Sequence, residues 1–403
     1  MTLTRIILVC TAVLLSVTQA QAKSFEEYLQ RLKEHPQVSS ALAESDKYNE
    51  LSKGEMGLPD PQLILGVDNV PIDDPAFDRF FPSSKTLGFR QAIPSYSLRK
   101  AKSEQQKGMS KKQKLFADYT AKRLEAYLIT ALVELDKVKS LEKYAKKQLK
   151  YYVELEGYLK GQLESGNSVY GRFSEIDVER TDVEQKLNNL KAEKDTIEAE
   201  LVRLVGEVPQ ITFPNVPITP WQHNSEQSYA VTIAKEDIGI ASQKIEAADS
   251  AFGPNYGIQA LYKQREDGSN FAGDDWFSVQ ATVSVPLWYH WNQKPKLKAA
   301  EASKQAAEFS YEDKKRMWQK KLTSLASERD VALANITLLQ EKKDAIREIV
   351  AAAERNYEAG NAELESVLDA QIDELTILSQ LASQRSRHMK LSAEFNSHII
   401  GDK

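Results

Sequence analysis

Acidic residues gather at the start of a helical pattern near the C-terminus, and their side chains are well suited to electrostatic chemistry. The four are Glu363, Glu365, Asp369 and Asp373. Carboxylates that meet in a narrow throat of low dielectric attract cations and repel anions. The helix dipole also favours acids at a helix start, so the same set is expected on a solvated helix. The pattern therefore predicts either a cation-selective constriction or an ordinary helix N-terminus.

Patterns for catalysis and metal binding do not appear in the sequence. No HExxH motif, glycine-rich phosphate loop or Gly-x-Ser-x-Gly elbow is present. The histidines, which show no metal-ligand spacing, are His35, His223, His290, His388 and His398. We therefore predict a protein that is not an enzyme and that uses no cofactor.

Charge and cysteine usage limit the partners and the compartment. The formal net charge is −5 with both signs mixed, so no basic block predicts binding to nucleic acid. Cys10, the only cysteine, lies in an apolar run from Ile6 to Val17 that precedes Ala20-Gln21-Ala22. This pattern predicts a cleavable signal peptide over 1–22 rather than a membrane anchor, which needs about 20 apolar residues. An exported chain without disulfides fits a bacterial envelope protein.

A glycine–asparagine pair occurs twice, each time between two long helical patterns. The two segments are Glu164-Ser165-Gly166-Asn167-Ser168 and Glu358-Ala359-Gly360-Asn361-Ala362. Glycine readily adopts the positive φ that ends a helix, and asparagine tolerates the same region. Each segment is therefore predicted to be the tip of a helical hairpin.

Other landmarks recur at almost the same spacing as the tips, which indicates an internal duplication. Pro61 corresponds to Pro254, and Pro94 corresponds to Pro286. The predicted division is a first structural repeat at 23–206, a proline-rich equatorial connector at 207–224 and a second structural repeat at 225–403.

Each repeat contains a segment with the two-residue alternation of β-strands. Leu63, Leu65 and Val67 alternate with other residues in the first repeat, and 279–285 alternates most cleanly in the second. The predicted β-hairpins cover 61–94 and 254–286. Strands of about ten residues match a tilted transmembrane β-strand, whereas no apolar run after residue 22 suits a membrane-spanning helix.

Long, charged helical patterns fill the rest of each repeat. The pattern from Leu98 to Leu163 would extend roughly 100 Å at about 1.5 Å per residue. The segment from Val169 to Val205 has a coiled-coil seam, formed by Ile176, Val183, Leu187, Leu190, Ile197, Leu201 and Leu204. The predicted fold is mainly α with a small β part, in which helical hairpins form coiled coils.

The predicted strands require several copies of the chain if they enter a membrane. Four strands cannot close a barrel, and open sheet edges are not tolerated in lipid. Three copies would supply a trimeric 12-stranded β-barrel and would join their helices into a periplasmic α-barrel. Aromatic residues near the strand ends suit the membrane interface, namely Trp276, Phe277, Trp288, Tyr289 and Trp291. The alternative is that they belong to the core of a soluble sheet.

Short motifs in a fixed order carry a family resemblance. They include Glu34-His35-Pro36, the stretch Gly57-Leu58-Pro59-Asp60-Pro61-Gln62-Leu63, and Gln91-Ala92-Ile93-Pro94 with its counterpart Val283-Ser284-Val285-Pro286-Leu287. The most specific is Tyr357-Glu358-Ala359-Gly360 followed by Ser366-Val367-Leu368-Asp369-Ala370-Gln371. After residue 22 the chain resembles the TolC-like outer membrane efflux family over essentially all of its length. Leu58 to Pro71 is most similar to members that work with heavy-metal cation pumps.

The resemblance implies an assembly and its partners. The expected protein is a homotrimeric channel-tunnel in the outer membrane of a Gram-negative cell, with outer membrane lipid around its barrel and a long periplasmic portion. It would dock onto a periplasmic membrane-fusion adaptor and an RND-type inner-membrane pump, and conduct heavy-metal cations passively. Gly166, Asn167, Gly360 and Asn361 would contact the adaptor.

The resemblance also assigns residues to a pore constriction. Asp369 matches an acidic position that rings the periplasmic entrance in the family. The family usually has a second acid three residues before this position, but Ser366 stands there in this chain. The adjacent Glu365 would supply the missing carboxylate from a neighbouring direction on the helix. Asp373 continues the acidic series along the same helix.

A gate latch is implied beside the second tip. Tyr357 matches a tyrosine that latches the closed entrance in family members. Arg172 and Ala362 stand where an acid and a base are expected, so the closed-state lock should differ in this chain.

Two alternatives compete with metal efflux. The same channel would also serve drugs or type I protein secretion, because specificity in such systems resides mainly in the pump. A soluble periplasmic coiled-coil scaffold or adaptor would explain the helices, but it would not explain the paired amphipathic strands or the duplication.

Overall fold

The computed structural model describes residues 24–211 and 216–401. The predicted signal peptide at 1–22 therefore lies outside the described residues. Two matching series of elements follow one another along the chain. The first is α1 (Phe25–Lys33), α2 (Pro36–Glu55), β1 (Gln62–Asp68), β2 (Ser84–Ile93), α3 (Tyr96–Glu164) and α4 (Tyr170–Val205). The second is the short 3-10 helix η1 (Ser225–Gln227), α5 (Tyr229–Ser250), β3 (Asn255–Gln264), β4 (Trp276–Ser284), α6 (Gln293–Glu358) and α7 (Leu364–His398).

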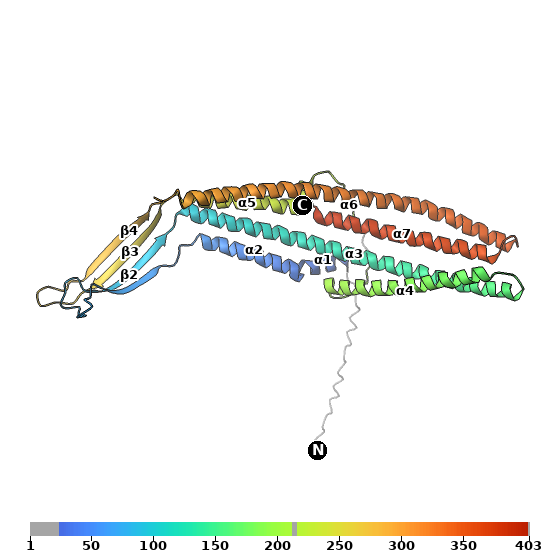
Figure 1. The fold of residues 1–403 in the computed structure, drawn as a ribbon, viewed down its shortest axis with the longest axis horizontal. Helices are drawn as coiled ribbons and strands as arrows, with labels where there is room; N and C mark the ends of the chain where they lie inside the picture. The colour runs from blue at the N-terminus through green and yellow to red at the C-terminus, as the bar shows by residue number, and fades with distance from the viewer. Residues whose placement is uncertain (1–23, 212–215, 402–403) are drawn as a thin grey trace, which may run out of the picture.

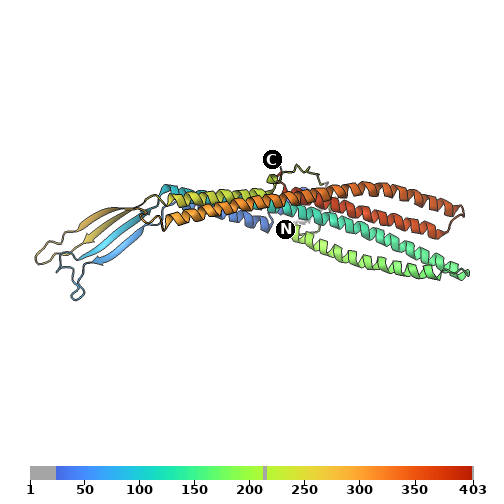
Figure 2. The ribbon, with the colours of Figure 1, turned by 45° about the horizontal axis from the view of Figure 1, so that its top comes forward.

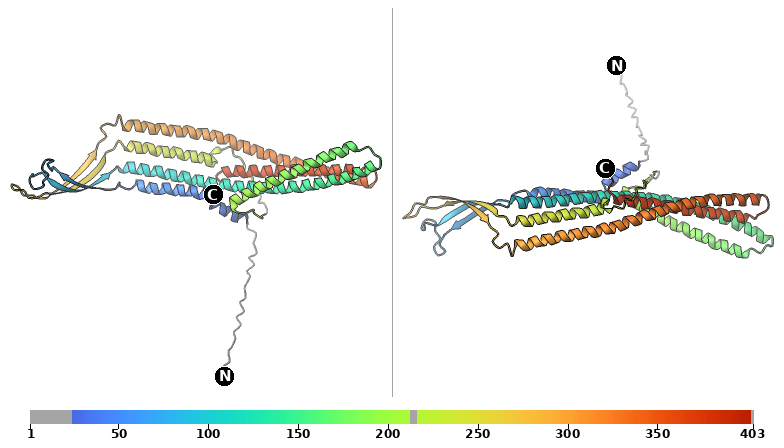
Figure 3. Two further views of the ribbon diagram at one scale, coloured as in Figure 1. Left: turned by 60° about the horizontal axis from the view of Figure 1, so that its bottom comes forward. Right: turned by 90° about the horizontal axis from the view of Figure 1, so that it is seen from above.

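The molecule is strongly elongated, with the sheet at one end and the two helical tips at the other (Figure 1). Helix α3 packs against α2 and α5 on the side toward the sheet, and against α4 and α7 on the side toward the tips. Helix α6 packs first on α5 and then on α7. The helices therefore form a long, slightly twisted layer rather than a compact bundle (Figures 2 and 3).

The four strands form one antiparallel sheet in chain order. Its register pairs Leu65 with Leu87, Leu87 with Tyr262, and Tyr262 with Phe277. Paired residues in antiparallel strands point to the same face. These four large side chains, all exposed, therefore share one apolar face of the sheet.

The opposite face of the sheet is polar. Arg90 donates to Gln259 at 2.9 Å, and Lys263 lies 2.7 Å from Asp68 in an ion pair. The outer strands β1 and β4 have no further strand beside them within the described parts of the chain. The sheet thus has two faces of opposite polarity and two open edges.

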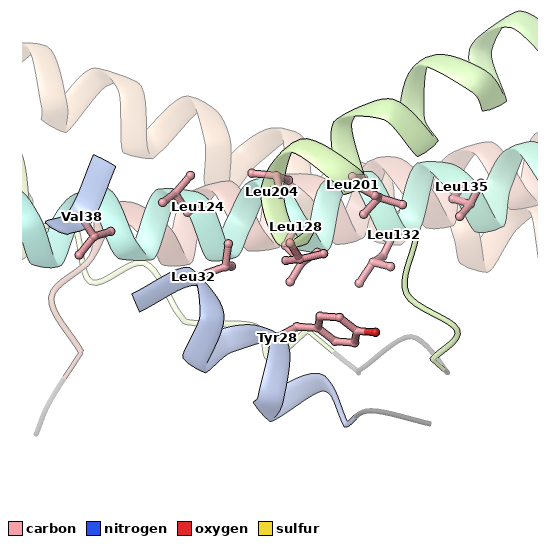
Figure 4. Packing of buried hydrophobic residues seen from close by; sticks show 11 residues of the cluster. Tyr28, Leu32, Val38, Leu124, Leu128, Leu132, Leu135, Leu201 and Leu204 are labelled. Carbon is pink, nitrogen blue, oxygen red and sulfur yellow. The ribbon is translucent and has the colours of Figure 1, made fainter. Parts of the chain in front are cut away.

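A hydrophobic cluster at mid-length fastens the N-terminal helix to the long helices. Tyr28 and Leu32 of α1 pack toward Leu124 and Leu128 of α3 and toward Leu204 of α4 (Figure 4). Burial of such side chains stabilises by about 1.5–3 kcal/mol each. The predicted seam of α4 faces its neighbours as expected, with Ile176, Val183, Leu190, Leu201 and Leu204 buried and Leu187 and Ile197 partly buried.

Candidate functional site

The two tips have the same backbone geometry. Gly166 has φ 91° and Gly360 has φ 72°, a region that glycine adopts without a Cβ clash. Each glycine N–H donates to the carbonyl three residues earlier, at 3.0 and 2.9 Å, and the following asparagine N–H donates to the carbonyl five residues earlier, at 3.0 and 2.8 Å. This pair of bonds is the Schellman motif. The predicted hairpin tips are therefore confirmed in both repeats.

A cluster of charged residues joins the two hairpins next to the tips. We call it the Arg172 cluster, and it contains Arg172, Glu175, Glu179, Glu365 and Asp369. Arg172 of α4 donates from Nε to Glu365 at 2.8 Å and from Nη2 to Asp369 at 2.9 Å, both on α7. Its Nη1 atom lies 3.4 Å from Glu175 and 3.5 Å from Glu179 on its own helix. One guanidinium therefore bridges two helices and faces four carboxylates.

The excess of carboxylates in this cluster shifts the pKa values of Arg172 and Asp369. Burial disfavours the charged form of Arg172, but the hydrogen bond that Arg172 donates to Glu365 and the charges of Asp369 and Glu179 outweigh it and raise the pKa of Arg172. Burial raises the pKa of Asp369, and Arg172 counteracts this only partly because Glu365 and Glu179 also raise it. Asp369 is therefore the carboxyl group of the cluster that protonates at a pH above its ordinary range.

An apolar seam lies beneath the Arg172 cluster. Leu368 and Ile372 of α7 belong to one buried cluster with Ile176 and Val183 of α4 and with Leu155 of α3. Apolar surroundings lower the local dielectric and strengthen ion pairs at their border. The seam therefore holds α4 and α7 side by side where Arg172 crosses between them.

The other predicted site residues do not join this cluster. Ser366 and Asp373 are exposed on α7, and Asp373 forms no ion pair with any residue of 24–211 or 216–401. Tyr357 is also exposed, and its hydroxyl has no hydrogen-bond partner within the described chain. The structure thus brings Asp369 and Glu365 together, and leaves Ser366, Asp373 and the proposed Tyr357 latch apart from them.

Sequence reasoning missed a second cluster, which lies farther from the tips. We call it the Glu134 cluster, and it contains Glu134, Lys137, Glu193, Ser386 and Lys390. Glu134 of α3 accepts from Ser386 of α7 at 3.1 Å and forms ion pairs with Lys137 and Lys390. Lys137 in turn lies 2.8 Å from Glu193 of α4. Three helices meet there, but the only local sign in the sequence is an ordinary Glu–Lys pair three residues apart.

The Glu134 cluster is more buried than its counterpart at the tips. The Glu134 and Lys137 side chains are 14% and 17% exposed, compared with 45% for Asp369. Burial alone would raise the pKa of Glu134, but hydrogen bonds from Lys137 and Lys390 outweigh it and lower that pKa. Glu134 therefore remains ionised and shared between two lysines.

The predicted interface aromatics fall into two environments. Trp288 and Trp291 are exposed between β4 and α6, with ring centroids 6.0 Å apart, and Phe277 is exposed on the apolar face of the sheet. Tyr289 instead packs 6.2 Å from Phe252. Trp276 lies at the far end of the sheet, where its ring covers Arg265 at 4.4 Å together with Phe81. Trp276 is therefore part of a loop contact rather than of the face that carries Phe277.

No helix within the described residues is both long and apolar enough to cross a membrane. No group of three or more His, Cys, Asp or Glu side chains in residues 24–211 and 216–401 is arranged to hold a metal ion.

Comparison with known proteins agrees with this architecture. Residues 226–389 match the sequence model of a family described as outer membrane efflux protein. The fold is similar to VceC from Vibrio cholerae, with a TM-score of 0.73, 16% identity and coverage of 92% of this chain and 95% of that chain. It is also similar to CusC, with a TM-score of 0.75, 15% identity and coverage of 92% and 91%. The open state of the MtrE channel of Neisseria gonorrhoeae gives a TM-score of 0.76, 15% identity and coverage of 92% and 88%. No curated protein matches the sequence.

The two-faced sheet, the paired helical hairpins and the matched tips belong to a fold that this chain shares with these solved structures over 92% of its length. Residues 226–389 in addition match the sequence model of outer membrane efflux proteins.

Proposed function

We propose that three copies of this chain form the exit channel of a tripartite efflux system that expels heavy-metal cations. An RND-type inner-membrane pump and a periplasmic membrane-fusion adaptor would deliver the cations to the entrance between the tips. The two-faced sheet supports this assembly, because its exposed apolar face suits lipid and its polar face suits a water-filled lumen. The open edges of β1 and β4 would then pair between copies, which satisfies their backbone groups in the membrane.

The observation that carries the proposal is the acid excess of the Arg172 cluster. Four carboxylates face one guanidinium at the tip end of each chain. Three such clusters around one entrance would make its potential negative, which raises the local concentration of cations. Because no metal-holding group occurs among the described residues, the cations would pass with their water shell rather than bind to the wall.

A second candidate, efflux of polar organic molecules, is favoured by one groove. The groove has a volume of about 840 Å³ and lies between α4 and α6 over α7 and α3. Amide and hydroxyl groups line much of it, from Gln148, Asn335, Thr376, Ser379, Gln380 and Ser383. Charged side chains of both signs complete the lining, namely Glu179, Asp182, Lys186 and Lys342, and such a mixture suits polar organic solutes.

Planar-bilayer recordings of the purified protein test the conduit and its entrance together. We expect a cation-selective conductance, and we expect Asp369→Ala to lower both the selectivity and the block by multivalent cations. Asp195→Ala, which removes an exposed acid elsewhere on α4, is the matched control and should change neither. Unchanged selectivity in Asp369→Ala would remove Asp369 from the pore. Recovery of the wild-type protein from the soluble periplasm without detergent would contradict the channel itself.

Deletion of the gene tests the substrate class. We expect greater sensitivity to zinc, copper or cobalt, because the pump would lose its exit. Greater drug sensitivity with unchanged metal tolerance would favour the organic substrates that the polar groove suggests.

A further inference from the structure

The two junctions between a strand and a long helix have an unusual charge pattern. Between Asp78 and Glu104 the sequence contains no acidic residue, and the same is true between Asp275 and Glu301. Each interval runs from the second strand of a hairpin into the first turns of α3 or α6. The basic residues at the helix starts are Arg99, Lys100 and Lys102 in the first repeat and Lys294, Lys296 and Lys298 in the second. These two intervals therefore contribute only positive charge, whereas Glu55 at the end of α2 faces Lys102 of the first junction.

The sheet brings the two junctions to one end of the molecule. Ser95, next to α3, donates its N–H to the side chain of Asn255 at 3.2 Å, and Asn255 pairs in turn with Ser284 at the end of β4. The starts of α3 and α6 accordingly lie at the same end of the sheet (Figure 1). The loops at the other end carry the acids of this region, which are Asp73, Asp74, Asp78, Glu266, Asp267, Asp274 and Asp275. The sheet thus separates a basic end from an acidic end.

Exposed aromatic side chains lie immediately beside the basic residues. Trp288 and Trp291 are 70% and 79% exposed, and Tyr96 at the other junction is 61% exposed. These side chains are continuous with the apolar face of the sheet through Val283 and Val285, which are also exposed. Tryptophan and tyrosine favour the headgroup region of a bilayer, where one part of the ring is apolar and the other wet.

The lysines of the second junction have no partner in the described chain. Lys294, Lys296 and Lys298 are exposed, and none of their side chains forms an ion pair or hydrogen bond with a residue of 24–211 or 216–401. The first junction differs, because Arg99 donates to the Met56 carbonyl and Lys102 lies 3.9 Å from Glu55. Three unpaired lysine side chains beside exposed aromatic rings match the surface of an anionic bilayer. Such a bilayer is apolar in its interior and negatively charged at its headgroups.

We propose that the strand-to-helix junctions bind anionic phospholipids of the leaflet on the helix side of the sheet. This inference rests on the proposed function, because it requires the sheet to lie in a bilayer. Trp288 and Trp291 occupy the interfacial zone, and Lys294, Lys296 and Lys298 contact the headgroup phosphates. The acidic loops at the other end of the sheet repel anionic headgroups in the opposite leaflet. The preference for anionic lipid is therefore confined to the leaflet on the helix side.

Quenching by brominated lipids tests this proposal on the full chain. The purified protein is reconstituted in phosphatidylcholine vesicles with increasing brominated phosphatidylglycerol or, separately, brominated phosphatidylcholine. The variant Trp288→Phe/Trp291→Phe is measured in parallel. The tryptophan quenching that is present in the wild type and absent in this variant is the signal of these two residues. We expect a preference for phosphatidylglycerol of about fivefold or more at low ionic strength, since even a single lysine near an anionic surface contributes about fivefold. The preference should decrease as salt is added.

The variant K294Q/K296Q/K298Q should lower the preference to near one. The control K314Q/K320Q/K342Q removes three exposed lysines of the same helix that lie away from the junction, and it should keep the wild-type preference. Equal quenching by both lipids in the wild type would overturn the inference and leave the channel proposal standing. A preference that persists in K294Q/K296Q/K298Q would also overturn it. If neither lipid quenches Trp288 and Trp291, the sheet is not in the bilayer and the proposed function fails as well.

Discussion

The Arg172 cluster and the Glu134 cluster both join the first hairpin to the second, but the balance of their charges differs. At the tips one arginine faces four carboxylates, whereas farther from the tips one glutamate is shared by two lysines. The first cluster has excess acid, and its Asp369 side chain is 45% exposed, whereas Glu134 and Lys137 of the second cluster are 14% and 17% exposed. Like charges repel one another at the tips, whereas the Glu134 cluster pairs its two glutamates with two lysines. We infer that the hairpins separate at the tips while the Glu134 cluster remains intact.

The two clusters also respond to pH with opposite signs. The pKa of Glu134 is lowered, so its contribution to stability is present above the ordinary pKa of a glutamate and is lost as the pH falls through its lowered value. The pKa of Asp369 is raised, so its contribution is present below the ordinary pKa of an aspartate and is lost as the pH rises through its raised value. As the pH falls, Asp369 should therefore be protonated before Glu134.

The largest effect on stability is expected from Glu134→Gln. The substitution leaves the ammonium groups of Lys137 and Lys390 without their shared carboxylate, in a site where one of them is largely buried. We expect the free energy of unfolding to fall by about 3 kcal/mol, as measured by denaturant unfolding. Glu142→Gln, which breaks an exposed pair with Lys146 on the same helix, is the control and should cost about 0.5 kcal/mol or less. Equal losses in both variants would remove the distinction between the clusters.

Arg172→Ala should have a smaller effect on stability and a larger one on the closed state. It leaves Glu365 and Asp369 facing Glu175 and Glu179 without a cation, so α4 and α7 repel one another. We expect a loss of about 1 kcal/mol in unfolding and a clear rise in conductance in planar bilayers.

The control for Arg172→Ala is Arg180→Ala. Arg180 also forms several ion pairs, but its partners Glu156 and Asp177 lie on α3 and α4, within the first hairpin. The conductance of Arg180→Ala should stay at the wild-type level. A similar rise in both variants would mean that general loosening of the coiled coils, and not the bridge between hairpins, opens the entrance.

Acidification should change ion selectivity through Asp369. Lowering the pH from neutrality protonates this carboxyl group above the ordinary range of an aspartate, so cation selectivity should fall before the protein loses stability. In Asp369→Asn the selectivity should already be low at neutral pH, and that step of the pH profile should be missing. Selectivity measured by reversal potentials across the acidic range gives the comparison, and an unchanged step in Asp369→Asn would assign it to another acid.

The smallest effect is expected from Tyr357→Phe. The hydroxyl of Tyr357 has no hydrogen-bond partner in the described chain, so its removal should change the free energy of unfolding by less than about 0.5 kcal/mol. Conductance recordings then decide whether this tyrosine latches the entrance between copies. A rise as large as that of Arg172→Ala would support the latch implied by the family resemblance, whereas no change would leave the closed state to the ion pairs.

Local patterns in the sequence determined the elements of this protein. The Gly-Asn pairs specify positive φ and a Schellman end at Gly166 and Gly360, because only the backbone around them is involved. Alternation in 279–285 and the heptad seam of 176–204 fixed a strand and a packed helix, because the period of side chains along each element is set by its own geometry. The spacing of these landmarks also revealed the duplication and the acid-free intervals at both junctions.

Only the tertiary structure decided which charges meet. Arg172 and Asp369 are separated by 197 residues, and Glu134 and Lys390 by 256. In the sequence, each of these four residues is an ordinary charged residue of a long polar helix. The packing of α3, α4 and α7 brings the partners together. The register of the sheet likewise placed Trp276 on Arg265 and left Trp288 and Trp291 exposed beside unpaired lysines. Such contacts depend on how helices and strands cross in space, which the period of a single element does not encode.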